Sequence, residues 1–357
     1  MRRLPALLAA AAVIAACGHG DPWTFDHAPL TAPRQPGPVA RLTYNPGDDL
    51  DPAWFPDGSS FVYTTERRDR RDADHCVAVM GIEGGTLRGM LCERRPASDA
   101  NTDIFSVATP GPDGRVAVLY TIFDLFVLRG YYGRVLLVDS LDALLTFRRV
   151  PIAYPYRAAG GFTHDGIAEI AWRSPTQLAY LATLPNYPLP CKTCRRDAAT
   201  PVQVVLVDLA GDTAVTQAVP NTTFATSIAV QGPDTLYFTL MGDGRVFRRV
   251  LSSGEETVVR DYGSAIARDV QVTGRRLVAI VGGQVLVELL TNIGYVQNDD
   301  GGEVHVLDLA SGMETVVAVP TGRLFRRAAL SPDGRTLLAE SRASPADNWD
   351  IWMVGLP

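Results

Sequence analysis

Lysine is almost absent from this chain of 357 residues, and histidine is scarce. Lys192 is the single lysine, five histidines are present, and arginine carries nearly all of the positive charge. The formal net charge is −6, with acidic and basic residues interspersed, so no basic stripe indicates nucleic acid as a partner. The chain also lacks a Gly-x-Ser-x-Gly motif and a closely spaced histidine pair. These absences favour a protein that does not catalyse a reaction and holds no metal or cofactor, and we expect a monomer.

No apolar run is long enough to cross a membrane. The run Leu4 to Ala16 is too short, because a spanning helix needs about twenty residues. With Arg2 and Arg3 before it, the run is typical of an export signal. The stretch VIAAC that ends at Cys17 resembles the bacterial lipobox. That resemblance implies a signal peptide at 1–17 and a lipid on Cys17, whereas the alternative is an ordinary signal peptide with a chance cysteine.

Residues 18–36 hold four prolines and no periodic apolar pattern. We interpret them as a flexible tether with an end-to-end distance of roughly 25 Å. We therefore expect the protein to be lipid-anchored in the cell envelope, with residues 37–357 on the extracytoplasmic side of the membrane.

Residues 37–357 look like one unit repeated with variation. The apolar third segment of the unit aligns best, as CVAVMG at 76, RVLLVD at 134, QVVLVD at 203, EVHVLD at 303 and DIWMVG at 350. Alternating β-branched residues and Gly- or Pro-rich turns indicate an all-β domain. A spacing of about 45 to 70 residues is expected of propeller blades with insertions. We place the blade boundaries near 92, 151, 220, 261 and 320.

The first segments of the units align as well. One position holds Trp54, Trp172, Val230, Val272 and Leu330, and the residue before it is alanine in four of these five units. Small residues there fit inner strands that converge on an axis. The segments DPAWFPDGSSFVYTTERR at 51 and LSPDGRTLLA at 330 resemble the WD-like repeat of TolB and of prolyl oligopeptidase propellers. The resemblance implies a propeller but not a function, because many functions use this scaffold.

Closure of the ring sets the number of blades. The last unit ends in a third strand at 350–354, and the predicted strand Val39–Tyr44 has no unit of its own. If these two segments pair, the leading strand completes the last blade and only short sheet edges remain. The sequence therefore predicts a six-bladed β-propeller.

Four further cysteines form two predicted disulfides. Cys76 and Cys92 are equidistant from Gly84, so a hairpin would place them opposite each other on adjacent strands. Cys191 and Cys194 lie in a proline-rich loop, and a disulfide there is favoured over a redox couple or half a zinc site. Two free core thiols are the alternative for the first pair.

Loop lengths indicate a binding surface. Connections from strand two to three, and from strand four to the next blade, emerge on one face of a propeller. The long segments 66–74, 93–102, 123–133, 152–166, 184–201 and 289–302 belong to this set. Long loops in compact domains are usually functional, and Tyr154 and Tyr187 are candidates for recognition. We expect this long-loop face to bind a protein, a glycan or a small molecule.

Charged residues recur three positions before the aligned apolar residue. They are Asp51, Glu169, Asp269 and Arg327, and His164 and Asp165 precede the third blade. In lactonase-like propellers such a cluster holds a divalent metal, which implies a hydrolase as the alternative function. Arg327, however, would put a competing charge among the carboxylates, which favours a solvated polar rim with an arginine–carboxylate pair.

Overall fold

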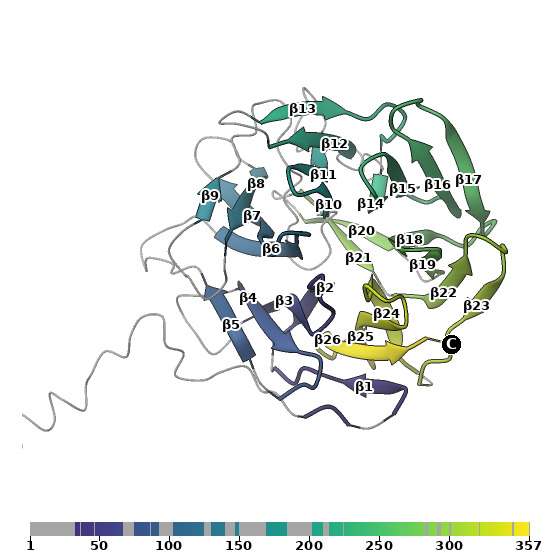
Figure 1. Cartoon of the computed structure of the whole chain (residues 1–357). Coiled ribbons are helices and arrows are strands. Elements are labelled where there is room, and N and C mark those ends of the chain that lie inside the picture. Colours follow the sequence, from purple (N-terminus) through teal and green to yellow (C-terminus); the bar gives the residue numbers. More distant parts are fainter. Residues whose placement is uncertain are drawn as a thin grey trace, which may run out of the picture.

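A computed structural model of the chain consists of six four-stranded antiparallel sheets arranged in a ring (Figure 1). The prediction of an all-β, six-bladed propeller is confirmed. Within the described part of the chain, no helix has the length and apolar character needed to span a bilayer. The structure describes residues 33–356 except 36, 46, 67–74, 86, 93–102, 125–129, 140–146, 150–168, 184–201, 210–213, 224, 283–284, 291–293, 300, 321 and 345.

The strands follow the ring in chain order. Blade 1 contains β2 (Asp49–Trp54), β3 (Ser60–Glu66), β4 (His75–Gly81) and β5 (Leu87–Cys92). Blade 2 contains β6 (Asp103–Pro110), β7 (Val116–Asp124), β8 (Gly130–Val138) and β9 (Phe147–Arg149). Blade 3 contains β10 (Ile170–Ser174), β11 (Gln177–Thr183), β12 (Val202–Asp208) and β13 (Val215–Ala218). Blade 4 contains β14 (Ala225–Gln231), β15 (Thr235–Leu240), β16 (Arg245–Val250) and β17 (Glu256–Asp261).

The last two blades depart from this simple order. Blade 5 contains β18 (Ala267–Thr273), β19 (Arg276–Val281), β22 (Glu303–Asp308) and β23 (Glu314–Val316). A separate hairpin of β20 (Val285–Leu290) and β21 (Gly294–Asp299) is inserted between β19 and β22. Blade 6 contains β24 (Leu324–Leu330), β25 (Thr336–Arg342) and β26 (Asp350–Gly355), and its outer strand is β1 (Val39–Arg41).

The leading strand closes the ring as predicted. Val39, Ala40 and Arg41 pair antiparallel with Val354, Met353 and Trp352 of β26. The strand is shorter than the predicted Val39–Tyr44, and Leu42, the residue that follows it, is completely buried. Contact with β26 still continues past β1, since the amide of Leu42 donates to the carbonyl of Ile351 at 2.9 Å.

Acidic side chains line the seam where blade 1 meets blade 6. The amide of Trp349 donates to Asp48, and Arg41 pairs with Asp350 at 2.7 Å. Asp49 is fully buried beside them, and burial raises its pKa to about 7 although the hydroxyls of Thr65 and Thr43 oppose the shift. The seam therefore joins the two ends of the chain through buried polar contacts as well as strand pairing.

The hydrophobic core lies between neighbouring blades rather than inside one sheet. Leu119 of blade 2, for example, shares a cluster with Tyr180 and Val205 of blade 3. Leu42 of the closing segment packs with Phe61 of blade 1 and Ile351 of blade 6. Each blade therefore depends on its neighbours to bury its apolar faces, so closure of the ring adds to the stability of the whole domain.

The strand order fixes which connections share a face. The four longest connections are 93–102, 150–169, 184–201 and 282–302, and each runs either from a fourth strand to the next first strand or from a second strand to a third. All four therefore leave on the long-loop face. The opposite face, here named the short-turn face, carries the turns between strands one and two and between strands three and four.

Two predicted long loops are partly strand. Residues 123–124 belong to β7 and 130–133 to β8, so only a short connection separates them. Residues 289–302 include most of the β20–β21 hairpin, which projects from blade 5 toward the middle of the ring in Figure 1. Both segments alternate too weakly between polar and apolar residues to be distinguished from loops by sequence pattern.

Leu42→Ala tests whether the closing segment is part of the core. Removing a fully buried leucine side chain should lower the free energy of unfolding by about 3 kcal/mol. Val258→Ala is the control, because this outer-strand side chain is 47% exposed and should change stability by less than about 0.5 kcal/mol. Chemical denaturation of both variants gives the comparison, and equal effects would contradict the closure.

Cys76 and Cys92 are direct cross-strand partners in β4 and β5, as their spacing about Gly84 predicted. The disulfide between them remains a prediction. A non-reduced digest should contain the linked peptides, whereas alkylation of both thiols without reduction would contradict the bond. Chain entropy predicts that Cys76→Ala together with Cys92→Ala costs roughly 3 kcal/mol.

Candidate functional site

Three inner strands carry the same irregularity at the position of the predicted charged residues. Their pairing shifts register around Asp51 in β2, Asp269 in β18 and Arg327 in β24. Each of these residues has a φ of 50°, in the left-handed region. A bulge re-aims the side chain it carries, and aspartate tolerates a positive φ better than arginine does. The bulges therefore turn three charged side chains in the same direction.

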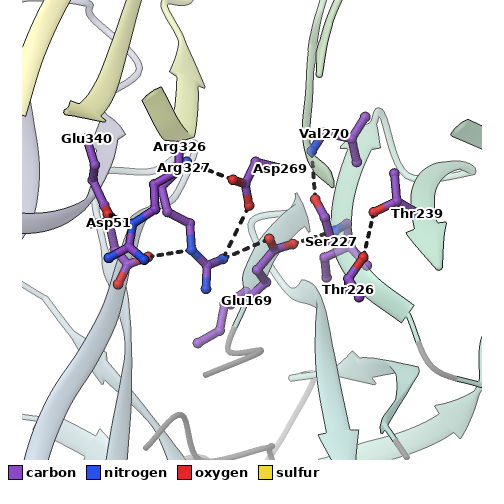
Figure 2. Close-up of polar contacts among 12 residues, drawn as sticks. Asp51, Glu169, Thr226, Ser227, Thr239, Asp269, Val270, Arg326, Arg327 and Glu340 are labelled. Atoms are coloured by element: carbon purple, nitrogen blue, oxygen red, sulfur yellow. Dashed lines mark hydrogen bonds and ion pairs between the residues drawn. The ribbon is translucent and has the colours of Figure 1, made fainter. Parts of the chain in front are cut away.

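The guanidinium of Arg327 lies among three carboxylates (Figure 2). Its Nε lies 3.4 Å from Asp51, and its Nη1 lies 3.1 Å from Glu169 and 3.8 Å from Asp269. The four side chains come from blades 1, 3, 5 and 6, so they meet on the axis of the ring. The predicted convergence of Asp51, Glu169, Asp269 and Arg327 is observed. We call these four residues the axial cluster.

The prediction of a solvated rim is wrong, because the side chains of the axial cluster are only 6–14% exposed, although the predicted arginine–carboxylate pairing is present. Burial raises the pKa of Glu169 to about 8, although Arg327 opposes the shift. Burial alone would lower the pKa of Arg327, but Asp51, Asp269 and Glu169 outweigh it and raise this pKa above its usual value. The guanidinium thus stays charged and offsets the repulsion among the carboxylates.

A second buried ion pair, which the sequence pattern does not predict, adjoins the axial cluster. Glu340 of β25 accepts a hydrogen bond from Nε of Arg326 at 2.7 Å and one from the amide of Asp51 at 2.6 Å. Arg326 also stacks on Trp349, 3.9 Å from the ring centroid. Burial raises the pKa of Glu340 to about 8, with Arg326 opposing the shift. In the sequence, this ion pair shows only as charged residues within two otherwise apolar segments, LFRRAAL and TLLAESR.

Side chains near the axis also join each blade to the next. In four successive blades an oxygen accepts a hydrogen bond from a backbone amide of the following blade. Glu169 accepts from Ile228, Ser227 from Val270 at 2.7 Å, Asp269 from Arg327 at 2.8 Å, and Glu340 from Asp51. The carboxylates of Glu169 and Asp269 therefore contact both Arg327 and a neighbouring backbone, which is a structural use of these groups.

A second ring of contacts lies on the short-turn face. There a side chain from one blade donates to a turn carbonyl of the next blade. The pairs are Arg115 with Pro175 at 2.6 Å, Arg173 with Pro233 at 3.0 Å, Gln231 with Gly274, and Arg276 with Gly334 at 2.8 Å. The aligned tryptophans complete the pattern, because Trp54 donates to Ala329 and Trp172 to Thr109, each in the preceding blade.

A cavity of about 270 Å³ follows the axis between the six inner strands. The axial cluster lies at its end toward the long-loop face. The aligned Ala53, Ala171, Ala229 and Ala329 line the cavity as well, together with Trp54 and Trp172. The predicted role of small residues at the axis is thereby confirmed. The volume of the cavity is below the range of about 300–1,000 Å³ usual for drug-sized ligands.

The axial carboxylates surround the guanidinium of Arg327 in place of a metal ion. Within the described residues, no group of three His, Cys, Asp or Glu side chains is arranged to hold a metal ion. Cys17, Tyr154, His164, Asp165, Tyr187, Cys191 and Cys194 lie outside the described residues, so their predicted roles remain predictions.

Fold and axial cavity together define the protein class as a six-bladed β-propeller. No family model matches the chain, and no curated protein matches it. It is similar in structure to a protein provisionally named gluconolactonase, with a TM-score of 0.52, 13% identity, and coverage of 89% of this chain and 91% of that one. It is also similar to a protein provisionally named TolB from Agrobacterium tumefaciens, with a TM-score of 0.51, 11% identity, and coverage of 93% and 100%. A prolyl endopeptidase structure gives 0.50 at 11% identity, covering 87% and 41%.

Arg327→Met tests the role of the guanidinium in holding the cluster. Methionine removes the charge but keeps much of the volume, so the buried carboxylates lose their cation. Breaking a buried ion pair in this way should cost about 3 kcal/mol or more near pH 8. Burial raises the pKa values of Glu169 and Glu340 in the folded protein. Their contribution to the free energy of unfolding is fully present below the pKa of the unfolded chain, and it is lost as the pH rises through the pKa of the folded protein. The cost should therefore be smaller at pH 5.

Arg275→Met is the matched control, because the Arg275 side chain is 74% exposed. Its effect on the free energy of unfolding should be small at both pH values. Chemical denaturation at pH 5 and pH 8 measures all three proteins. An Arg327→Met variant as stable as the parent at pH 8 would contradict the structural role of the cluster.

Proposed function

We propose that this protein is a lipid-anchored component of the cell envelope that binds a partner through its long-loop face and does not catalyse a reaction. The observation that carries the proposal is the one-sided distribution of the long connections. The four longest all belong to one face, and the axial cluster lies toward the same face. A rigid ring that presents variable loops on one side suits recognition.

The predicted export signal and the lipobox-like VIAAC support the envelope location. The four other cysteines support it as well, because the two disulfides predicted for them would form in an oxidising compartment. The proposed partner is a protein, a glycan or a small molecule, since all three kinds of ligand use such surfaces. Tyr154 and Tyr187 are the residues proposed to contact it, because tyrosine is enriched at recognition surfaces.

The alternative function is a metal-dependent hydrolase at the mouth of the axial cavity. It requires Asp51, Glu169 and Asp269 to share a metal ion. In this structure they share Arg327, and Glu169 and Asp269 also bind backbone amides. A cation placed there would have to displace or face the guanidinium, and this repulsion favours the binding protein over the enzyme.

Capture from detergent-solubilised envelopes of the producing cells tests the proposal. The full chain should retain a defined partner, and Tyr154→Ala together with Tyr187→Ala should reduce the captured amount about tenfold, which corresponds to 1.4 kcal/mol. Ser253→Ala on the short-turn face is the control and should capture the parental amount. If the tyrosine variant captures every partner as well as the parent does, the proposed surface is wrong.

Metal analysis of the purified chain tests the alternative. The proposal predicts no stoichiometric calcium or zinc and no thermal stabilisation by either ion. A bound ion at one per chain that is lost in Asp51→Asn or Asp269→Asn would favour the enzyme. Such an ion would also raise the thermal stability of the chain, because a ligand that binds the folded state stabilises it by mass action.

A further inference from the structure

The first described residues of the chain are attached to the short-turn face of the propeller. Pro33 forms a β-bridge with Gly84, and the amide of Arg34 donates to the carbonyl of Glu83 at 2.7 Å. Glu83 and Gly84 form the turn from β4 to β5, which joins the third strand of blade 1 to the fourth. Turns of this kind lie on the short-turn face, so the chain enters the ring there.

The direction of β1 leads to the same conclusion. β1 is the fourth strand of blade 6 and runs antiparallel to β26. Fourth strands begin at the short-turn face and end at the long-loop face. The chain therefore arrives at the short-turn face, contacts the turn of blade 1, and then runs along the outer edge of blade 6 toward the long-loop face.

From this geometry we infer that the membrane anchor holds the propeller with its short-turn face toward the lipid surface and its long-loop face away from it. The inference rests on the proposed lipid at Cys17. Residues 18–32 would then connect the lipid to the short-turn face, and they reach at most about 50 Å when fully extended. An anchored ring would thus expose its binding loops to partners beyond the membrane.

Exposed apolar side chains also occur on the short-turn face. Among the described residues, the two most exposed large apolar side chains are Met313 at 72% and Val215 at 66%. Met313 precedes β23 and Val215 begins β13, so both lie where a third strand turns into a fourth, on the short-turn face. Apolar side chains are better tolerated beside a lipid surface than on a face that must stay open to water.

Energy transfer to labelled lipid measures the orientation directly. A donor fluorophore is attached at Arg335→Cys, in the short turn after β24, or at Ala346→Cys, in the connection before β26. Both residues are exposed and both belong to blade 6, so the two labels differ mainly in the face they occupy. The full-length lipidated chain is reconstituted into phosphatidylcholine vesicles that contain an acceptor-labelled lipid. The chain without added cysteine gives the background from native thiols.

Transfer from residue 335 should exceed transfer from residue 346 by about twofold, because a strand of six residues separates the faces by roughly 20 Å. Equal transfer, or greater transfer from residue 346, would overturn the orientation and leave the anchor intact. The same labels in Cys17→Ser should give no transfer. If the lipidated chain gives no more transfer than Cys17→Ser, the anchor itself is wrong, and the proposed function fails with the orientation.

Discussion

Pairing of β1 with β26 is the interaction on which the rest of the structure depends. Because each blade buries its apolar faces against its neighbours, an open ring would leave two such faces in water. Three residues of β1 and the buried Leu42 close that gap. The contacts around the seam are polar as well as apolar, with Arg41 on Asp350 and Trp349 between the guanidiniums of Arg326 and Arg342.

Closure also explains the axial cluster. Once the ring is closed, inner strands from all six blades meet at the axis, where their backbone amides must find acceptors. Glu169, Ser227, Asp269 and Glu340 supply them between successive blades. Carboxylates gathered so closely need a cation, and Arg327 provides it. We therefore regard the charged centre as part of the ring's construction, whereas the proposed recognition surface is the long-loop face.

The sequence was informative wherever a repeat fixed the position of a residue. The aligned third strands, the Pro-Asp-Gly turns and the spare leading strand were sufficient to predict six blades and their closure, and the aligned first strands placed Asp51, Glu169, Asp269 and Arg327 at the axis. Glu340 was not predictable in this way, because it comes from a second strand and only the three-dimensional packing brings it to Asp51. The left-handed bulges at Asp51, Asp269 and Arg327 were not predicted, because neither glycine nor asparagine marks these positions and arginine favours no positive φ. Inserted segments such as β20–β21 follow no repeat, so the sequence pattern predicts loops there.

Hydrogen exchange at the seam tests the closed ring most directly. The amides of residues 39–43 should exchange as slowly as those of β3 and β4, because releasing the leading strand would open the ring and expose the cores of blades 1 and 6. If residues 39–43 exchange at the rate of an unstructured peptide while β3 and β4 stay protected, the leading strand does not hold the ring together.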